Sequence, residues 1–269
     1  MRIYKTLPEL KRERQMSVWH KALRSSWSPE DIDWKTPVGI PDDNRRDQLA
    51  RVLSPVLMGE QAGLYSITSI IQILGQTANV EAQLFLTSMA LDEAKHAELF
   101  TLYYGRLQRG ALSIRRLPSG YLFQSAIMSD DPIEWLTGSL VSEVVAKHTL
   151  EELRTLDFDP VLNEICDRIL ADEARHLGFN HIFLTDRFRE ARAEDATAAD
   201  ETAGRLGQRL EQVLALVPPI LEALGKDIEA LGIRRGPFIE RLYEETRTRL
   251  RRSLGARDLE IPELEGDSA

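Results

Sequence analysis

The sequence predicts an all-α protein whose core is four long helices paired as two antiparallel hairpins. Apolar residues recur with helical periodicity almost throughout, and the alternating patterns typical of β-strands are nearly absent. One pentapeptide also occurs twice, as DEAKH at residues 92–96 and as DEARH at residues 172–176, each time inside a long helical stretch. This repeat is the clearest functional signal in the chain.

The expected elements follow from these patterns in chain order. An N-terminal helix is expected at about 8–23, then a loop at 25–41. The four core helices are expected at about 43–74, 78–109, 132–156 and 160–191. The crossover between the hairpins lies near 117–120 and carries a short helix at 121–128. The C-terminal part is expected to hold polar residues at 194–204, a helix ending near Pro218-Pro219, a helix at 237–254 and an acidic tail at 261–269.

Each copy of the repeat places a glutamate three residues before a histidine. Glu93 and His96 therefore share one helix face, as do Glu173 and His176, and each pair can offer a carboxylate and an imidazole to one metal ion. Bundles that bind two iron or manganese ions use two such pairs plus one glutamate from each of two further helices. The alternative is a bundle in which these residues make salt bridges or face solvent.

Glu60 is the candidate glutamate of the first hairpin. It is the only carboxylate in the apolar run at 52–74, where a lone acid is costly unless it is paired or bound to a metal. The midpoint between Glu60 and Glu93 falls among Gly75, Gln76, Thr77 and Asn79. A turn there places the two glutamates at the same height on antiparallel helices.

The same argument selects Glu143 in the second hairpin. Its midpoint with Glu173 is Phe158, inside a turn that ends in Asp159-Pro160, a helix cap followed by a first-turn proline. The midpoints of the other candidates fall outside an evident turn; these are Glu134, Glu151 and Glu152. The predicted ligand set is Glu60, Glu93, His96, Glu143, Glu173 and His176.

Bulk properties agree with a soluble globular protein. The chain has 269 residues, 43% of them hydrophobic and 29% charged, and one domain is expected, with the core bundle at 43–191 and accessory helices at 200–255. No apolar run approaches the roughly twenty residues that span a bilayer, and residues 1–5 lack a signal-peptide core, so we expect a cytoplasmic protein without a membrane span. The net charge of −9 argues against nucleic-acid binding.

With these residues in place, the chain resembles the ribonucleotide reductase small-subunit superfamily of the ferritin-like fold, especially its ligand-binding oxidase relatives. WSPEDID at residues 27–33 resembles the Trp-x-Pro-x-x-Ile/Val-Asp segment of that superfamily, and the resemblance covers about residues 16–190. It implies a ferritin-like four-helix bundle, an Fe/Fe or Mn/Fe pair, dioxygen as co-substrate and a homodimer. It also implies that Asp172 forms a hydrogen bond with the His96 ring, with support from Trp27. Asp92 is expected either to play the matching part for His176 or to be an exposed helix carboxylate.

Departures from the superfamily narrow the activity. Phe100 stands where radical-storing subunits carry tyrosine, and no tyrosine follows Tyr243. The tyrosines needed to pass a radical to a large subunit are therefore missing. Ala62 and Gly138 occupy the positions of the valine and tyrosine that form a crosslink in the oxidases, so that crosslink cannot form. Small residues there indicate either a substrate pocket or close helix packing.

Two further residues are candidates near the site. Tyr103 lies on a face similar to that of His96 and is a candidate for oxidation, with ordinary packing as the alternative. Lys147 follows Glu143 by one helical turn, so its ammonium is expected either near the carboxylates or, as is common for lysine, at the surface.

The sequence therefore predicts an oxygen-activating dinuclear oxidase or monooxygenase for a small or lipid-like organic molecule, served by an external electron donor. One alternative is a reductase-type radical generator without a tyrosyl radical. The alternative of another class is a non-enzymatic protein that binds or stores iron.

Overall fold

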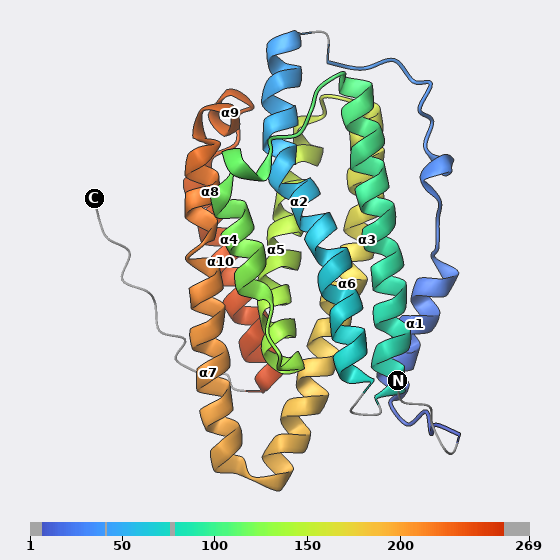
Figure 1. Ribbon diagram of the computed structural model, residues 1–269, viewed down its shortest axis with the longest axis vertical. Coiled ribbons are helices and arrows are strands. Elements are labelled where there is room, and N and C mark those ends of the chain that lie inside the picture. Colours follow the sequence, from blue (N-terminus) through green and yellow to red (C-terminus); the bar gives the residue numbers. More distant parts are fainter. Residues whose placement is uncertain (1–6, 41, 76–78, 256–269) are drawn as a thin grey trace, which may run out of the picture.

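The computed structural model describes residues 7–40, 42–75 and 79–255. The predicted all-α class is confirmed, since every regular element among these residues is a helix. Four long helices run side by side as a bundle (Figure 1). They are α2 (Asp43–Leu74), α3 (Val80–Leu107), α5 (Pro132–Leu156) and α6 (Pro160–Glu194).

The bundle consists of two helical hairpins. Helix α2 packs along α3, and α5 packs along α6. The side chain of Asp159 accepts a hydrogen bond from the Val161 amide and caps α6, whose first residue is Pro160. Asn79 caps α3 in the same manner through the Ala82 amide. Residues 76–78 of the expected first turn lie outside the described residues.

The crossover between the hairpins carries η2 (Ile114–Arg116) and α4 (Pro118–Ile127), which packs against α5. Helix α4 begins before the expected residue 121 because Pro118 occupies its first turn. Gly138 of α5 permits the close approach of α4, since a Cβ atom on Gly138 would lie 2.9 Å from the Ile127 carbonyl oxygen. This position therefore serves helix packing, the second of the two readings of Gly138.

Accessory helices flank the bundle on two sides (Figure 1). Helix α1 (Glu13–Arg24), which is followed by η1 (Pro29–Asp31), packs against α3 and α6. On the other side, two helices cover α5 and α6: α7 (Ala196–Leu214) and α10 (Arg235–Leu254). Arg209 of α7 donates hydrogen bonds to three carbonyl oxygens at the end of α4, those of Ala126, Ile127 and Met128.

The structure corrects the expected C-terminal part. Residues 196–204 form the first turns of α7 and are not a polar lead-in, because Asp195 caps the helix at the Ala198 amide. Helix α7 ends at Leu214, close to the expected end near Pro218-Pro219, but the two prolines lie in the first turn of a further helix, α8 (Val217–Ala223), where proline needs no hydrogen-bonded amide. Helix α9 (Gly225–Ala230) was not expected. The expected tail at 261–269 lies outside the described residues.

Helix α1 begins at Glu13, later than the expected residue 8. No helix in the described ranges is both long enough and apolar enough to span a bilayer.

We expect Gly138→Ala to lower the free energy of unfolding by about 1–3 kcal/mol, the usual cost of forcing an extra methyl group into a packed contact. Gly204→Ala in α7 is the matched control, because a Cβ there meets no atom within 4 Å. Alanine should stabilise that helix by about 0.5–1 kcal/mol. Urea denaturation of both variants measures the difference, and equal stabilities would contradict the packing role of Gly138.

Candidate metal centre

The six predicted ligands come from the four bundle helices and converge in the interior. Each is at most 7% exposed. Helix α2 supplies Glu60 and α5 supplies Glu143, whereas α3 and α6 each supply a Glu-x-x-His pair. The structure thus brings together all six: Glu60, Glu93, His96, Glu143, Glu173 and His176.

The ligands form two overlapping groups of four. Donor atoms of Glu60, Glu93, His96 and Glu173 all lie within 4.8 Å of one another, as do those of Glu93, Glu143, Glu173 and His176. Glu93 and Glu173 belong to both groups. Two carboxylates shared by two Glu–His sets would allow these residues to hold two metal ions side by side.

Both imidazoles are oriented in the same way. The Nδ1 atom of His96 lies 3.1 Å from Glu60 Oε2, and its Nε2 atom lies 3.1 Å from Asp172 Oδ2. In the second half, His176 places Nδ1 3.3 Å from Glu143 Oε2 and Nε2 3.4 Å from an oxygen of Asp92. Each ring therefore turns Nδ1 toward the glutamates and Nε2 toward an aspartate, which holds the ring in the orientation that a ligand needs.

Two basic side chains, those of Lys95 and Arg175, contact these aspartates. Lys95 Nζ lies 2.6 Å from Asp92 and 3.8 Å from Asp172, and Arg175 donates hydrogen bonds to both aspartates. All four side chains are buried. The Trp27 indole N–H donates to Asp172 at 3.0 Å, and the Lys95 ammonium lies 4.3 Å from the Trp27 ring centroid. Asp92, Lys95, Asp172 and Arg175 form a neutral group, here named the charge quartet.

Sequence reasoning missed Lys95 and Arg175. The signal was present, because both copies of the repeat carry a cation immediately before the histidine and three residues after the aspartate. At that spacing a basic and an acidic side chain meet on one helix face. The contacts that join the Asp–Lys pair of α3 to the Asp–Arg pair of α6 depend on the packing of α3 against α6, so the sequence alone does not predict them.

Burial raises the pKa of Glu93 and Glu173 well above the usual range of glutamate, and the charges of neighbouring carboxylates add to this effect. Burial alone disfavours a charged His96, but Glu60 and Asp172 outweigh it and raise the His96 pKa to about 9. Without metal ions the group therefore retains protons that offset the carboxylate charge.

The residues fit a pair of divalent metal ions. One carboxylate oxygen of Glu173 is buried and has no hydrogen-bond partner among the described residues, a condition that a bound cation relieves. Gly63 leaves space for the Glu93 carboxylate, since a Cβ atom there would lie 2.6 Å from Glu93 Oε2. Carboxylate oxygens combined with imidazole nitrogens are the donors that iron and manganese accept.

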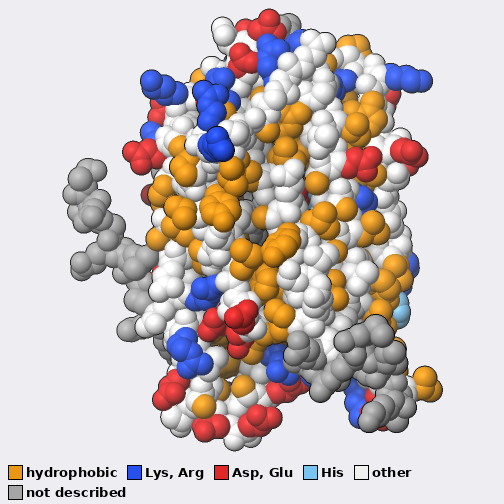
Figure 2. Space-filling model, viewed as in Figure 1, with side chains coloured by type: hydrophobic (Ala, Val, Ile, Leu, Met, Phe, Trp, Pro, Cys, Tyr) orange, Lys and Arg blue, Asp and Glu red, His pale blue; other side chains and the backbone are white. Residues whose placement is uncertain are grey.

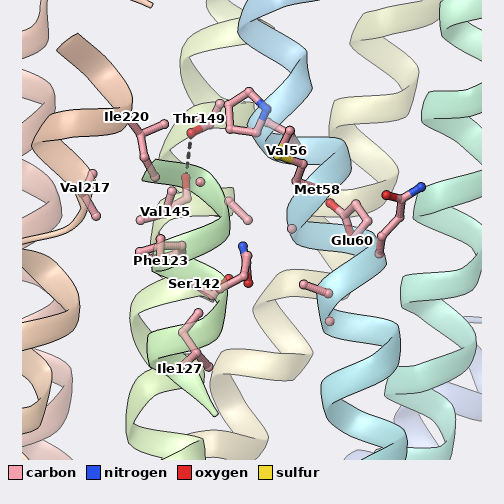
Figure 3. Close-up of a pocket in the computed structure, with 18 of the residues that line it drawn as sticks. Val56, Met58, Glu60, Phe123, Ile127, Ser142, Val145, Thr149, Val217 and Ile220 are labelled. Atoms are coloured by element: carbon pink, nitrogen blue, oxygen red, sulfur yellow. Dashed lines mark hydrogen bonds between the residues drawn. The ribbon is translucent and has the colours of Figure 1, made fainter. Parts of the chain in front are cut away.

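A cavity of about 550 Å³ adjoins the ligands, and Glu60, Glu93, Glu143 and Glu173 form part of its wall. Figure 3 shows Val56, Met58 and Glu60 on one side of this space, Phe123 and Val145 facing them, and Val217 and Ile220 farther away. The volume is within the range of small-molecule sites. Ala62 lines the cavity whereas Gly138 does not.

The mouth of the cavity lies between α2 and the η2–α4 segment. The exposed lining residues all belong to these elements: Gln61, Tyr65, Ile114, Tyr121 and Met128. Figure 2 shows apolar side chains gathered along the middle of this face. The lining residues from α5 and from α8 to α10 are buried or half-buried, so those helices close the far side.

Three candidates from the sequence lie away from the cavity. The Tyr103 hydroxyl donates to Asp159 at 3.1 Å, at the cap of α6, and Phe100 is buried in the core. The Lys147 ammonium pairs with Glu245 at 2.9 Å and with Glu151, not with the carboxylate group, because α10 packs on that face of α5.

The three glutamates that were not selected as ligands form hydrogen bonds or ion pairs with other residues. Glu134 accepts a hydrogen bond from Ser129, and Glu152 pairs with Arg241. Glu151 pairs with Lys147 and is half exposed. None of the three belongs to either group of clustered donors.

We expect Gly63→Ala to weaken the binding of Mn(II) at least about tenfold, because the new methyl group displaces the shared Glu93 carboxylate. Gly59→Ala, one helical turn earlier, is the matched control, since its Cβ makes only an ordinary contact of 3.5 Å with Gln124. Titration followed by metal analysis measures both. Equal affinity in the two variants would show that Glu93 needs no space at Gly63.

The stability of the metal-free protein should fall as the pH rises from about 6.5 to about 9. The His96 pKa is raised from 6.5 to about 9 in the folded state, so its protonated form stabilises the fold below pH 6.5, and this contribution is lost as the pH passes the folded pKa. The raised pKa values of Glu93 and Glu173 act in the same direction. Thermal melts of chelator-treated protein test this, and a melting temperature that rises across this range would contradict it.

Comparison with known proteins agrees with this geometry. No family model and no curated protein sequence matches the chain. Among solved structures, R2-like ligand-binding oxidase with an aerobically reconstituted Mn/Fe cofactor has a TM-score of 0.72 and 17% identity, over 93% of this chain and 98% of that chain. The same oxidase after photoconversion has a TM-score of 0.72 and 16% identity, over 93% and 99%. The chain therefore has the ferritin-like fold of these oxidases.

Proposed function

We propose that this protein is an oxygen-activating dinuclear oxidase or monooxygenase that acts on a small or lipid-like organic molecule. The observation that carries the proposal is the pair of overlapping donor groups beside an apolar cavity. The proposed cofactor is Fe/Fe or Mn/Fe, and the Mn/Fe cofactor of the structural neighbours supports this choice. The electron donor, a homodimeric state and a cytoplasmic location stay predictions.

The bound ions would supply electrons to dioxygen and the oxidising power to attack a C–H or N–H bond. Glu60 and His96 would hold one ion, Glu143 and His176 the other, and Glu93 and Glu173 both. Two divalent ions offset the formal charge of the four carboxylates, so the loaded centre needs no further countercharge. The protein's remaining tasks are to orient these ligands and to control access.

The charge quartet and Trp27 would keep both imidazoles in the ligating orientation. Asp172 accepts hydrogen bonds from Trp27 and Arg175 while it contacts His96, so the aspartate cannot turn away from the ring without losing them. Burial and the Asp92 charge oppose ionisation of Asp172, but the contact with His96 and the charge of Arg175 together outweigh them and lower the Asp172 pKa. The carboxylate form therefore persists beside the ring.

Radical export receives less support from the structure. Phe100 is fully buried and offers no phenol, and Tyr103 is committed to Asp159. Burial and the Asp159 charge also raise the pKa of Tyr103, which disfavours loss of its proton. A substrate cavity that reaches the metal ligands favours oxidation of a bound molecule instead.

Purified, reductant-supplied protein should consume dioxygen, and Glu93→Ala or His176→Ala should lower this rate by more than about 100-fold because each removes a ligand. Glu151→Ala is the control, since that glutamate is half exposed and lies outside the donor groups. Metal content is measured on the same samples by mass spectrometry. An unchanged rate in either ligand variant would refute the proposed function.

A further inference from the structure

The cavity wall carries no positive charge. Among the described residues that line it there is no lysine, arginine or histidine, and its only ionisable acids are the four metal-ligand glutamates. With two divalent ions in place these glutamates are neutralised, so neither the wall nor the loaded centre presents an unpaired protein charge to a ligand. An ionic group on the substrate would therefore lose its hydration without gaining a side-chain partner.

Several polar side chains in the wall bond no described residue, among them Gln124, Ser125, Ser139 and Ser142. Most serine and threonine hydroxyls within these helices donate to a carbonyl oxygen one turn earlier, as Thr137 and Thr149 of α5 do. Ser142 of α5 lines the cavity, yet its hydroxyl bonds no described residue. The same is true of the Gln124 amide on α4.

Gln124 and Ser142 lie near the helix positions that carry two of the predicted ligands, Glu60 and Glu143. The Gln124 amide nitrogen is 3.5 Å from the place where a Cβ of Gly59 would be, immediately before Glu60 on α2. Ser142 immediately precedes Glu143, and Figure 3 shows it among the labelled residues that line the cavity. Apolar side chains of the C-terminal helices form another part of the wall: Val217, Ile220, Leu224, Ile228 and Phe238.

We propose that the cavity binds an uncharged amphipathic molecule and that Gln124 and Ser142 determine this specificity. The hydrogen-bonding group of the molecule, a primary amide or a hydroxyl, contacts the Gln124 amide and the Ser142 hydroxyl. Its apolar part extends toward α8–α10. The identity of the bound molecule as a substrate rests on the proposed function, whereas its binding does not.

Octanamide, octanoate and 1-chlorooctane are suitable probes because they share a chain and differ in charge and hydrogen bonding. Titration calorimetry is carried out on metal-free protein and again under argon with two Mn(II) ions per chain, so neither dioxygen nor turnover enters the result. The variants are Gln124→Leu and Ser142→Ala. Gln72→Leu is the matched control, because Gln72 is exposed on α2 outside the cavity.

We expect octanamide to bind more tightly than octanoate in both forms. Gln124→Leu should weaken octanamide about tenfold, and Ser142→Ala a few-fold, because each removes a hydrogen-bond partner. Binding of 1-chlorooctane should be unchanged or tighter in Gln124→Leu, which separates a lost hydrogen bond from a damaged fold. Gln72→Leu should leave all three affinities unchanged.

Two results would overturn the proposal. One is tighter binding of octanoate than of octanamide by the Mn(II) form with no effect of Gln124→Leu, which would place the polar end of the ligand on the ions. The other is the absence of octanamide binding from both forms. Octanamide binding that depends on Gln124 in a protein that takes up no metal would refute the proposed function while this assignment stands.

Discussion

The constraint on which the structure depends is the burial of four carboxylates in one small space. Donor atoms of Glu60, Glu93, Glu143 and Glu173 lie within a few ångströms of histidine nitrogens in the bundle interior, where charge is poorly solvated. Such a group is stable only if protons or cations accompany it. The glycine at position 63 and the fixed orientation of both rings are best understood as adaptations to that requirement.

The charge quartet behind the histidines, unlike the four inner carboxylates, has no excess of negative charge. The charge quartet combines two aspartates with one lysine and one arginine, so it balances its own charge without help from the centre. The deficit of positive charge is thereby confined to the inner carboxylates, the place where metal ions can correct it. The repeat of five residues supplies the whole charge quartet and four of the six predicted ligands, because its acid, its base and its ligands occupy neighbouring positions on one helix face.

Features set by helix geometry were predictable from the sequence, whereas those set by neighbouring helices were not. Glu60 and Glu143 could be selected because the two ends of a hairpin are equidistant from its turn, and the structure places both in the donor groups. The direction of Lys147 depends on Glu245 of α10, and the role of Gly138 depends on the Ile127 carbonyl of α4; both partners lie on another helix, whose packing the sequence pattern does not show. The short helix α8 was not predicted because a proline in the first turn of one helix looks, in the sequence, like the proline that follows another.

The shared glutamates have a consequence for how the molecule is assembled. Each donor group takes three ligands from one hairpin and one from the other, through Glu173 in the first group and Glu93 in the second. Neither hairpin can complete a site while the two are apart. Under the proposed function, ion binding and hairpin docking would therefore be coupled, and a filled centre would oppose separation of the two hairpins. Metal supply during synthesis would then govern how long the newly made chain survives proteolysis.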